Sequence, residues 1–413
     1  MACPRLALVV RLPPSDLTID KMILTQCAVC ATELGLSLGK KCGRCSTRYC
    51  GPECQKQHWE EGGHDKLCKK IKKAGGAEQY NANQKYSEAV TVAAEACAED
   101  TKGQTCYICT QALHWKTKEG LVRGCSCRGT SGFAHVSCLA EEAGILVAEA
   151  EENNLGDQAA NQRLNRWLVC GLCEQEYRGV VMHALGWACW RMYLGRPEDD
   201  MVRMNAMTAL GNGLRAVSQI KKRLGLLESQ LALMIRNRVH PEALLANQGA
   251  IATCLEHLGR IEESQKLAVQ VHGRTKELLG TRHKNTIISA GNLAISLQDS
   301  GRHAEALSLT AEYIPVSESE LGPHDSATLR LRNSYLRSRC FEVVERSQVD
   351  PSVSLEDIRE IAVSFEDLYR TALRVLGGQH PITVQCKEDI AVCRTGIART
   401  EARTEARMAA LKL

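Results

Sequence analysis

The sequence predicts a mostly α-helical protein in which two small cross-braced Cys/His modules precede a solenoid of helical repeats. Of the 21 cysteines, fourteen stand in close pairs or beside a well-placed histidine before residue 174. Beyond residue 178 this pairing stops, and short apolar runs recur at the three- and four-residue spacing of helices. Aromatic residues make up only 4% of the 413-residue chain, less than a β-sandwich or barrel usually contains.

Composition and charge limit which compartment the chain can occupy and which partners it can bind. A net charge of +4 is too small to indicate nucleic-acid binding by itself, although ten Lys/Arg against five Asp/Glu fall between Cys27 and Lys73. No secretory signal is visible, and no apolar run reaches the roughly 18 residues of a membrane span. We therefore expect an intracellular protein, cytoplasmic or nuclear. In such a reducing compartment, paired cysteines indicate metal binding rather than disulfide bonds.

Eight Cys and His residues between positions 27 and 68 have the spacing of ligands for two tetrahedral zinc ions. A two-residue gap lets a tight turn bring both thiolates onto one ion, and a three-residue gap places two ligands one helical turn apart. Few large apolar residues lie between them, so metal must supply most of the folding free energy, of order 10 kcal/mol per site. The four pairs are Cys27 with Cys30, Cys42 with Cys45, Cys50 with Cys54, and His64 with Cys68.

This segment resembles a MYND-type zinc finger, most clearly in the run Tyr49-Cys50-x3-Cys54-Gln55-x2-His58-Trp59 followed by His64-x3-Cys68. The resemblance implies two interleaved sites. His58 is a rival ligand to His64, but its spacing to Cys68 disfavours it. The implied ligand sets are Cys27, Cys30, Cys50 and Cys54 on one zinc, and Cys42, Cys45, His64 and Cys68 on the other.

MYND fingers are peptide-binding domains, often for proline-containing motifs. By this resemblance Gln55 and Trp59 would lie near the peptide groove. Plain packing of Trp59 against its helix is an equally weighted alternative.

A second set of eight ligands lies between positions 106 and 173, in the order four cysteines, one histidine and three cysteines. With the single-residue gap at Cys125-x-Cys127 and the run Arg128-Gly129-Thr130, it resembles the RING-CH (RINGv) finger over about residues 104–178. The resemblance again implies two zinc ions, which makes four in the chain. Its ligand sets are Cys106, Cys109, His135 and Cys138 on one zinc, and Cys125, Cys127, Cys170 and Cys173 on the other.

RING-type domains are mostly ubiquitin ligases, and the resemblance implies a docking face for a ubiquitin-conjugating enzyme. That face would use Ile108, between the first two cysteines, together with Trp167 and Leu172. Core packing is the alternative for each of the three. Two departures weigh against activity: Glu174 stands where many ligases place a basic residue, and the insert 139–166, expected to form a helix and then a flexible loop, is long.

The remainder of the chain repeats itself with a period of 42 residues. Gly259-Arg260 corresponds to Gly301-Arg302, and Leu279-Gly280 corresponds to Leu321-Gly322. Each unit is expected to be a helix, a Gly-Arg turn, a longer helix and a Leu-Gly stop. A weaker third unit carries an insert near Asp350. These helical hairpins resemble the tetratricopeptide repeats of kinesin light chains over about residues 200–395, whose stacked inner face binds protein segments.

Several polar side chains in the repeats have two interpretations. Asn292 and Asn333 could bind an extended peptide, but hydrogen bonds between helices are the favoured role. His283, His324 and His380 each follow a Leu-Gly turn, and a structural role in that loop is favoured over metal binding.

The expected domains follow from these segments, and no catalytic side chain is predicted. We expect a zinc-binding protein-interaction protein that acts as a RING-CH-type ubiquitin ligase or ligase adaptor, with a non-enzymatic scaffold as the alternative. A methyltransferase with a MYND insertion is excluded, because no segment is left for its catalytic domain. The expected order is a flexible N-terminus (1–24), a MYND-type finger (25–70), a helical linker (71–102), a RING-CH-type finger (103–178), a connecting helix (179–199) and TPR-like repeats (200–413).

Overall fold

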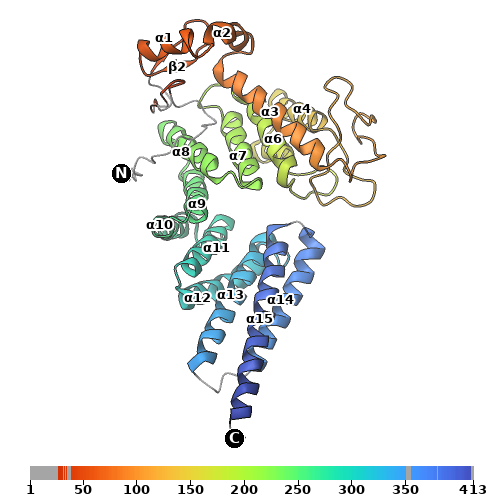
Figure 1. Ribbon diagram of the computed structural model, residues 1–413, viewed down its shortest axis with the longest axis vertical. Helices are drawn as coiled ribbons and strands as arrows, with labels where there is room; N and C mark the ends of the chain where they lie inside the picture. Colours follow the sequence, from red (N-terminus) through yellow and green to blue (C-terminus); the bar gives the residue numbers. More distant parts are fainter. Residues whose placement is uncertain are drawn as a thin grey trace.

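The computed structural model describes residues 27–30, 32, 34, 39–349, 355–378 and 380–410. The expected flexible segment 1–24 and the insert near Asp350 lie outside these residues. Figure 1 shows an elongated molecule with α1 and α2 at one end and the last helices of the repeats at the other. The elements are β1 (Lys40–Lys41), β2 (Arg48–Tyr49), α1 (Pro52–Glu60), α2 (His64–Lys73), α3 (Ala77–Ala96), α4 (Val136–Glu152), α5 (Asp157–Leu164), the 3-10 helix η1 (Asn165–Trp167), α6 (Gly179–Tyr193), α7 (Met201–Ala216), α8 (Ile220–Arg236), α9 (Pro241–His257), α10 (Ile261–Leu279), α11 (Lys284–Asp299), α12 (His303–Glu320), α13 (Ser326–Val349), α14 (Leu355–Leu376) and α15 (Pro381–Ala410).

The first Cys/His module is a short antiparallel hairpin, β1–β2, followed by α1 and α2. Its apolar core is small: besides cysteines it buries only Leu34, Tyr49 and Ile71 among the described residues. A core of this size cannot by itself offset the conformational entropy lost on folding. The module therefore depends on what its cysteine and histidine side chains bind.

The insert of the second module is helical along most of its described length. The expected helix is α4, but the expected flexible loop is instead α5 followed by the single turn η1. Ala159 and Ala160 favour a helix here, and Leu164 packs against the central core. The prediction of a loop was wrong, because the packing that stabilises this helix involves residues distant in the sequence and leaves no local pattern.

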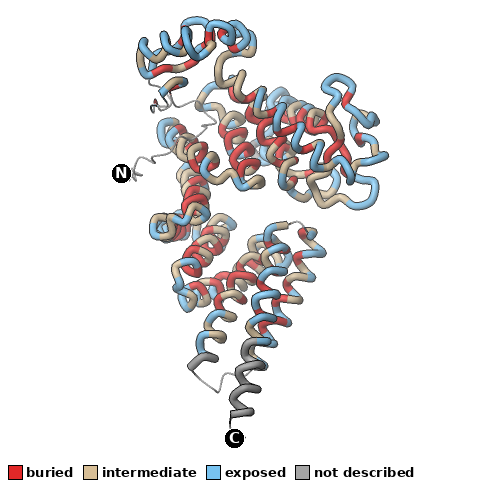
Figure 2. The backbone as a smooth tube through the Cα atoms, viewed as in Figure 1, coloured by how far each residue is buried: buried red, intermediate tan, exposed pale blue. Residues whose placement is uncertain are grey.

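The central core joins the second module to the start of the repeat array. A continuous cluster of buried side chains runs from α3 through the second module and α6 to α7 and α8. Figure 2 shows this buried stretch along α6 and α7. Trp187 and Trp190 on α6 are each 1% exposed and belong to this core. The module and the first repeat hairpin thus share one interior.

Two glycines allow α6 and α7 to approach closely. A Cβ on Gly186 would lie 2.8 Å from the carbonyl oxygen of Ala209 and 3.1 Å from Cα of Leu210. A Cβ on Gly213 would lie 3.0 Å from Cα of His183. In both cases the neighbour is backbone, which cannot rotate away as a side chain can.

We expect Gly186→Ala to destabilise the protein by about 1–3 kcal/mol, because the added methyl group forces the two helix backbones apart. The midpoint of urea unfolding measures this. Gly225→Ala is the matched control: Gly225 is also helical, but its Cβ would meet nothing within 4 Å. The control should keep or gain up to about 1 kcal/mol through helix propensity. Equal effects of the two substitutions would contradict the close approach.

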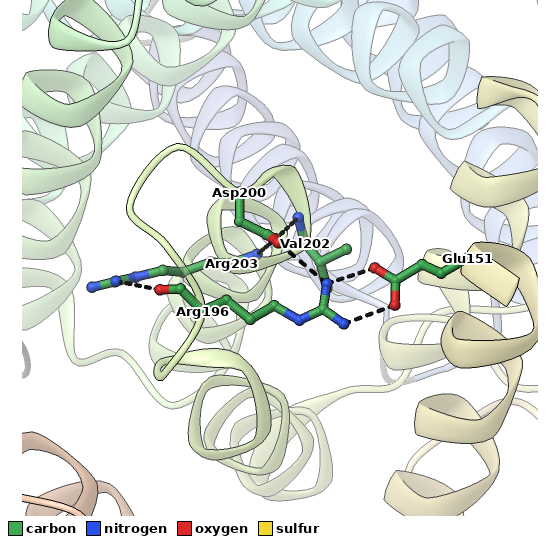
Figure 3. Close-up of polar contacts among 5 residues, drawn as sticks. All are labelled: Glu151, Arg196, Asp200, Val202 and Arg203. Atoms are coloured by element: carbon green, nitrogen blue, oxygen red, sulfur yellow. Dashed lines mark hydrogen bonds and ion pairs between the residues drawn. The ribbon is translucent and has the colours of Figure 1, made fainter. Parts of the chain in front are cut away.

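An ionic network ties the insert helix α4 to the start of the repeats (Figure 3). Nη1 of Arg196 lies 2.5 Å from Oε1 of Glu151, and Nη2 lies 2.8 Å from Oε2, a bidentate pair that lowers the pKa of Glu151. Arg196 also contacts Asp200 at 3.3 Å. The same Asp200 caps α7 by accepting hydrogen bonds from the backbone N–H groups of Val202 and Arg203 at 2.8 and 3.0 Å.

The repeats follow the predicted 42-residue pattern. Gly259 and Gly301, each with φ of +74°, make the turns between α9 and α10 and between α11 and α12. After each turn an arginine and a glutamate three residues later form a bidentate pair, Arg260 with Glu263 and Arg302 with Glu305.

Helix capping explains two of the loop histidines. Nδ1 of His283 accepts a hydrogen bond from the N–H of Asn285 at 3.2 Å, and Nδ1 of His380 accepts one from Ile382 at 3.2 Å. His240 caps α9 in the same way, at 3.4 Å from the N–H of Glu242. For α13, Asp325 rather than His324 makes this contact, with the N–H of Ala327 at 2.8 Å.

Asn292 and Asn333, the two candidate peptide-binding asparagines, both join helices. Nδ2 of Asn333 donates to Oδ2 of Asp389 on α15 at 3.1 Å, and Oδ1 of Asn292 accepts from Nη1 of Arg330 on α13 at 3.4 Å.

No helix among the described residues is both long and apolar enough to cross a membrane.

Candidate metal centres and partner surface

The structure gathers the sixteen predicted ligands into four groups of four. In each group the four ligand atoms lie within 4.8 Å of one another. The grouping crosses the sequence order, so each module interleaves its two sites. The groups are Cys27, Cys30, Cys50 and Cys54; Cys42, Cys45, His64 and Cys68; Cys106, Cys109, His135 and Cys138; and Cys125, Cys127, Cys170 and Cys173.

Sulfur–sulfur distances in two of these groups match those of tetrahedral zinc. With Zn–S bonds of about 2.3 Å, two sulfurs of one tetrahedron lie about 3.8 Å apart. Sγ of Cys42 lies 3.9 Å from Sγ of Cys68, and Sγ of Cys127 lies 3.8 Å from Sγ of Cys170. Every described cysteine is free. Sets of four thiolates, or three thiolates and one imidazole, suit zinc better than the oxygen-seeking cations.

The first module places its ligands ahead of the hairpin, at its turn, just before α1 and on both helices. Cys42 and Cys45 lie at the turn between β1 and β2, and His64 and Cys68 lie one turn apart on α2. Nε2 of His64 lies 3.3 Å from Sγ of Cys45. Cys54 is helical as expected, whereas Cys50 lies two residues ahead of α1 because Pro52 begins that helix.

The rival histidine of the first module has a different partner. Nδ1 of His58 lies 3.0 Å from the hydroxyl of Tyr49, and His58 belongs to none of the four groups. Its ring packs against the ring of His64, with centroids 4.8 Å apart. His58 thus supports the ligand His64.

In the second module the ligand His135 is oriented through its second nitrogen. Nδ1 lies 3.4 Å from Sγ of Cys109 and 3.6 Å from Sγ of Cys138, while Nε2 faces the carbonyl oxygen of Ala112 at 3.4 Å. A hydrogen bond from Nε2–H to that carbonyl leaves Nδ1 unprotonated and free to bind a metal.

Both sites of the second module contain the same knuckle turn. The N–H of Ile108 donates to Sγ of Cys106, and the N–H of Leu172 donates to Sγ of Cys170, each at 3.4 Å. Such bonds stabilise the thiolate form that binds metal. The turn also points the side chain between the two cysteines outward: Ile108 is 39% exposed and Leu172 is 53% exposed.

Trp167 was predicted to lie on the partner surface, and the structure corrects this. Its side chain is 2% exposed and packs edge-on against Tyr193 of α6, with ring centroids 5.9 Å apart. It belongs to the central core, because the helices of the insert and α6 close over it. No partner can reach it in this fold.

The other predicted partner residues are accessible. On α1, Trp59 is 44% exposed with its ring 5.8 Å from that of His64, and Gln55 is half-buried one turn earlier. Sequence reasoning missed two exposed apolar side chains of the second module, Leu113 at 58% and Trp115 at 68%. Their position between the first two ligand pairs of the module was the available signal.

A contact between the second module and the end of the repeats was also missed. Oγ of Ser126, which stands between two ligands, lies 3.4 Å from the carbonyl oxygen of Leu376, and Nη2 of Arg178 donates to the same oxygen. Gly377 lies against both side chains. The last repeat hairpin thus returns to the zinc module from far along the chain, which no local sequence pattern indicates.

Comparison with known proteins identifies three kinds of module. The MYND finger matches residues 27–68, the RING-variant domain residues 106–145 and the tetratricopeptide repeat residues 242–319. No curated protein matches the chain. The structure extends the RING-variant match, because Cys170 and Cys173 complete its second ligand group.

Solved structures with similar repeats include a putative kinesin light chain from Podosopora anserina with nearly identical TPR-like repeats, at 16% identity. It covers 58% of this chain and 97% of its own, with a TM-score of 0.33, and a variant of that protein gives 17% identity, the same coverage and a TM-score of 0.34. BtubC (BKLC) from P. vanneervenii has 12% identity over 65% of this chain and 92% of its own, with a TM-score of 0.34.

The predicted fold class and module types are confirmed. The chain is mostly helical and contains a MYND finger, a RING-variant domain and tetratricopeptide repeats, with Cys/His clusters suited to zinc. Modules of this kind give the chain a role in binding other proteins.

Proposed function

We propose that the chain is a zinc-dependent E3 ubiquitin ligase or ligase adaptor, in which the RING-variant domain engages a ubiquitin-conjugating enzyme. The observation that supports this most is the pair of knuckle residues Ile108 and Leu172. Each is a large apolar side chain held in solvent by a metal-binding turn. Apolar side chains on a rigid support are typical anchors of protein interfaces.

The proposed activity needs no nucleophile from this chain. The RING-variant domain would hold the charged conjugating enzyme, and the MYND finger and repeats would hold the target, so that the rate arises from proximity. Four zinc ions, one in each ligand group, would fix the two modules. Gln55 and Trp59 would contact a peptide motif on the MYND finger. An intracellular setting, cytoplasmic or nuclear, belongs to this proposal, because ubiquitin transfer takes place there.

One observation favours a second candidate, a scaffold without enzymatic activity. Glu174 directly follows the last ligand, is exposed and has a left-handed backbone with φ of +54°. Its carboxylate stands where many RING ligases present a basic residue to ubiquitin. A scaffold would bind proteins through the same MYND and repeat surfaces.

The test is an autoubiquitination assay on the zinc-loaded whole chain with a panel of conjugating enzymes. We expect Ile108→Ala to reduce chain formation about tenfold or more, since loss of an interface anchor costs about 1–2 kcal/mol. Val363→Ala is the control, because Val363 is 56% exposed on α14 and lies thirteen residues before Leu376, the α14 residue whose carbonyl contacts the zinc module. It should retain wild-type activity.

Zinc content is measured for both variants, so that loss of metal is not mistaken for loss of docking. Chain formation that survives Ile108→Ala would contradict the docking face. A folded, fully metallated wild-type chain that forms no chains with any enzyme of the panel would instead support the scaffold.

A further inference from the structure

Two cysteines outside the zinc modules lie in direct contact in the last part of the repeat array. Sγ of Cys340 on α13 lies 3.3 Å from Sγ of Cys393 on α15. Among the described residues they belong to no group of three or more metal ligands. The pair is therefore a dithiol without the further ligands that zinc requires.

The contact follows from the register of the two helices. Asn333 on α13 meets Cys386 on α15, with the Sγ–H of Cys386 donating to Oδ1 at 3.2 Å. Cys340 and Cys393 each lie seven residues further along, so both contacts join residues 53 positions apart. Helices that keep a constant offset run parallel, and seven residues return to the same face. Neighbouring contacts thus hold the cysteines opposite each other.

The two thiols differ in access and in acidity. Cys340 is half-buried, whereas Cys393 is 2% exposed in the apolar cluster between α13, α14 and α15. The contact between the two thiols lowers the pKa of Cys340, and the same contact together with burial raises the pKa of Cys393. The less buried thiol, Cys340, is thus the one whose pKa is lowered, which suits attack on an oxidant.

We propose that Cys340 and Cys393 are a modification site, a dithiol that a peroxide converts into a reversible disulfide between α13 and α15. The Cys340 thiolate attacks one peroxide oxygen, the O–O bond breaks and the departing hydroxide takes up a proton to become water. The sulfur of the Cys393 thiol then attacks the resulting sulfenic acid. The S–S bond forms, the S–O bond breaks and the hydroxide leaves as water with the thiol proton.

The overall change is two thiols plus hydrogen peroxide to one disulfide plus two waters. The sulfurs must approach by about 1.3 Å to reach the bond length of about 2.05 Å, which side-chain rotation and small helix shifts can supply. A thiol reductant reverses the reaction by exchange. This site does not depend on whether the RING-variant domain is a ligase.

A disulfide here would fix the far end of the repeat array. It joins the two helices that Asn333 and Asp389 already connect, and it closes a loop that contains α14. The carbonyl of Leu376 at the end of α14 contacts Arg178 of the RING-variant domain. Oxidation would therefore stiffen the hairpin that rests on the zinc module.

The experiment exposes the zinc-loaded whole chain to graded hydrogen peroxide, then alkylates all remaining thiols under denaturing conditions. Peptide mass spectrometry reads each cysteine separately, so oxidation of zinc ligands cannot imitate the pair. We expect one linked peptide that contains Cys340 and Cys393, parallel loss of both free thiols, and full recovery with dithiothreitol. The melting temperature of the oxidised chain should rise by several degrees.

Three variants test the assignment. Cys340→Ser and Cys393→Val should each abolish the linked peptide and the rise in melting temperature, and the second keeps an apolar side chain in the core. Cys386→Ser should leave the link intact. The proposal is overturned if both thiols stay free at peroxide levels that oxidise an added reference dithiol. Separate oxidation of both to sulfinic acids, or a link through Cys386, would overturn it equally.

Discussion

Replacing Cys68 with serine is expected to unfold the first zinc module, residues 27–73, while the repeat helices stay folded. Cys68 is 0% exposed and lies in the ligand group with Cys42, Cys45 and His64. Four of the seven buried residues in this module's core cluster are themselves ligands. Metal binding of order 10 kcal/mol per site must therefore supply most of its folding free energy.

The readouts are zinc content and hydrogen exchange. We expect the variant to lose the zinc of this module, and the backbone amides of α1 and α2 to exchange as in an unfolded chain. Cys97→Ser is the matched control, because Cys97 is half-buried at the end of α3 and lies in no ligand group. It should keep all its zinc. Full protection of α2 in the Cys68→Ser variant would refute the metal dependence.

Local chemistry is what the sequence could predict. Metal ligands impose fixed spacings, so pairs such as Cys106 with Cys109 were visible without any knowledge of the fold. The repeats impose a period, and the two equivalent turns at Gly259 and Gly301 both adopt positive φ. Where a metal ion or a turn requires a particular residue type at a fixed spacing, the sequence was sufficient to locate the ligands and the turns.

Long-range packing is what the sequence could not predict. Trp167 stands just before a ligand pair, where the resemblance places a partner contact, yet its side chain faces Tyr193 from a different element. The contact of Arg178 with Leu376 likewise joins segments 198 residues apart. Neither contact leaves a periodic pattern, because each depends on how whole helices are arranged.

The two zinc modules also differ in a way that ligand spacing alone does not reveal. The first has a core of its own made largely of ligands, whereas the second shares the central core with α3, α6, α7 and α8. Ligand loss in the second module should therefore be opposed by this apolar packing. Conversely, damage to the shared core should weaken the second module even though no ligand has changed.

Trp187→Ala is the prediction that tests this shared interior. Trp187 is 1% exposed at the centre of α6, and its removal should destabilise the shared unit by about 3–5 kcal/mol through lost burial and a residual cavity. Because α6 packs on both α3 and α7, we expect zinc release from the RING-variant domain and loss of helix signal from the first repeat hairpin to shift together. During thermal denaturation, circular dichroism measures the helix signal and a zinc-binding dye measures the zinc release.

The matched control on the same helix is Met192→Ala. Met192 is 44% exposed, so its truncation should cost less than about 1 kcal/mol. If Trp187→Ala lowered the helix transition while zinc release kept its wild-type temperature, the module and the repeats would have separate cores. A joint shift would mean that the RING-variant domain is held in place by the repeat array, so that its knuckle residues Ile108 and Leu172 keep a fixed orientation relative to the repeats.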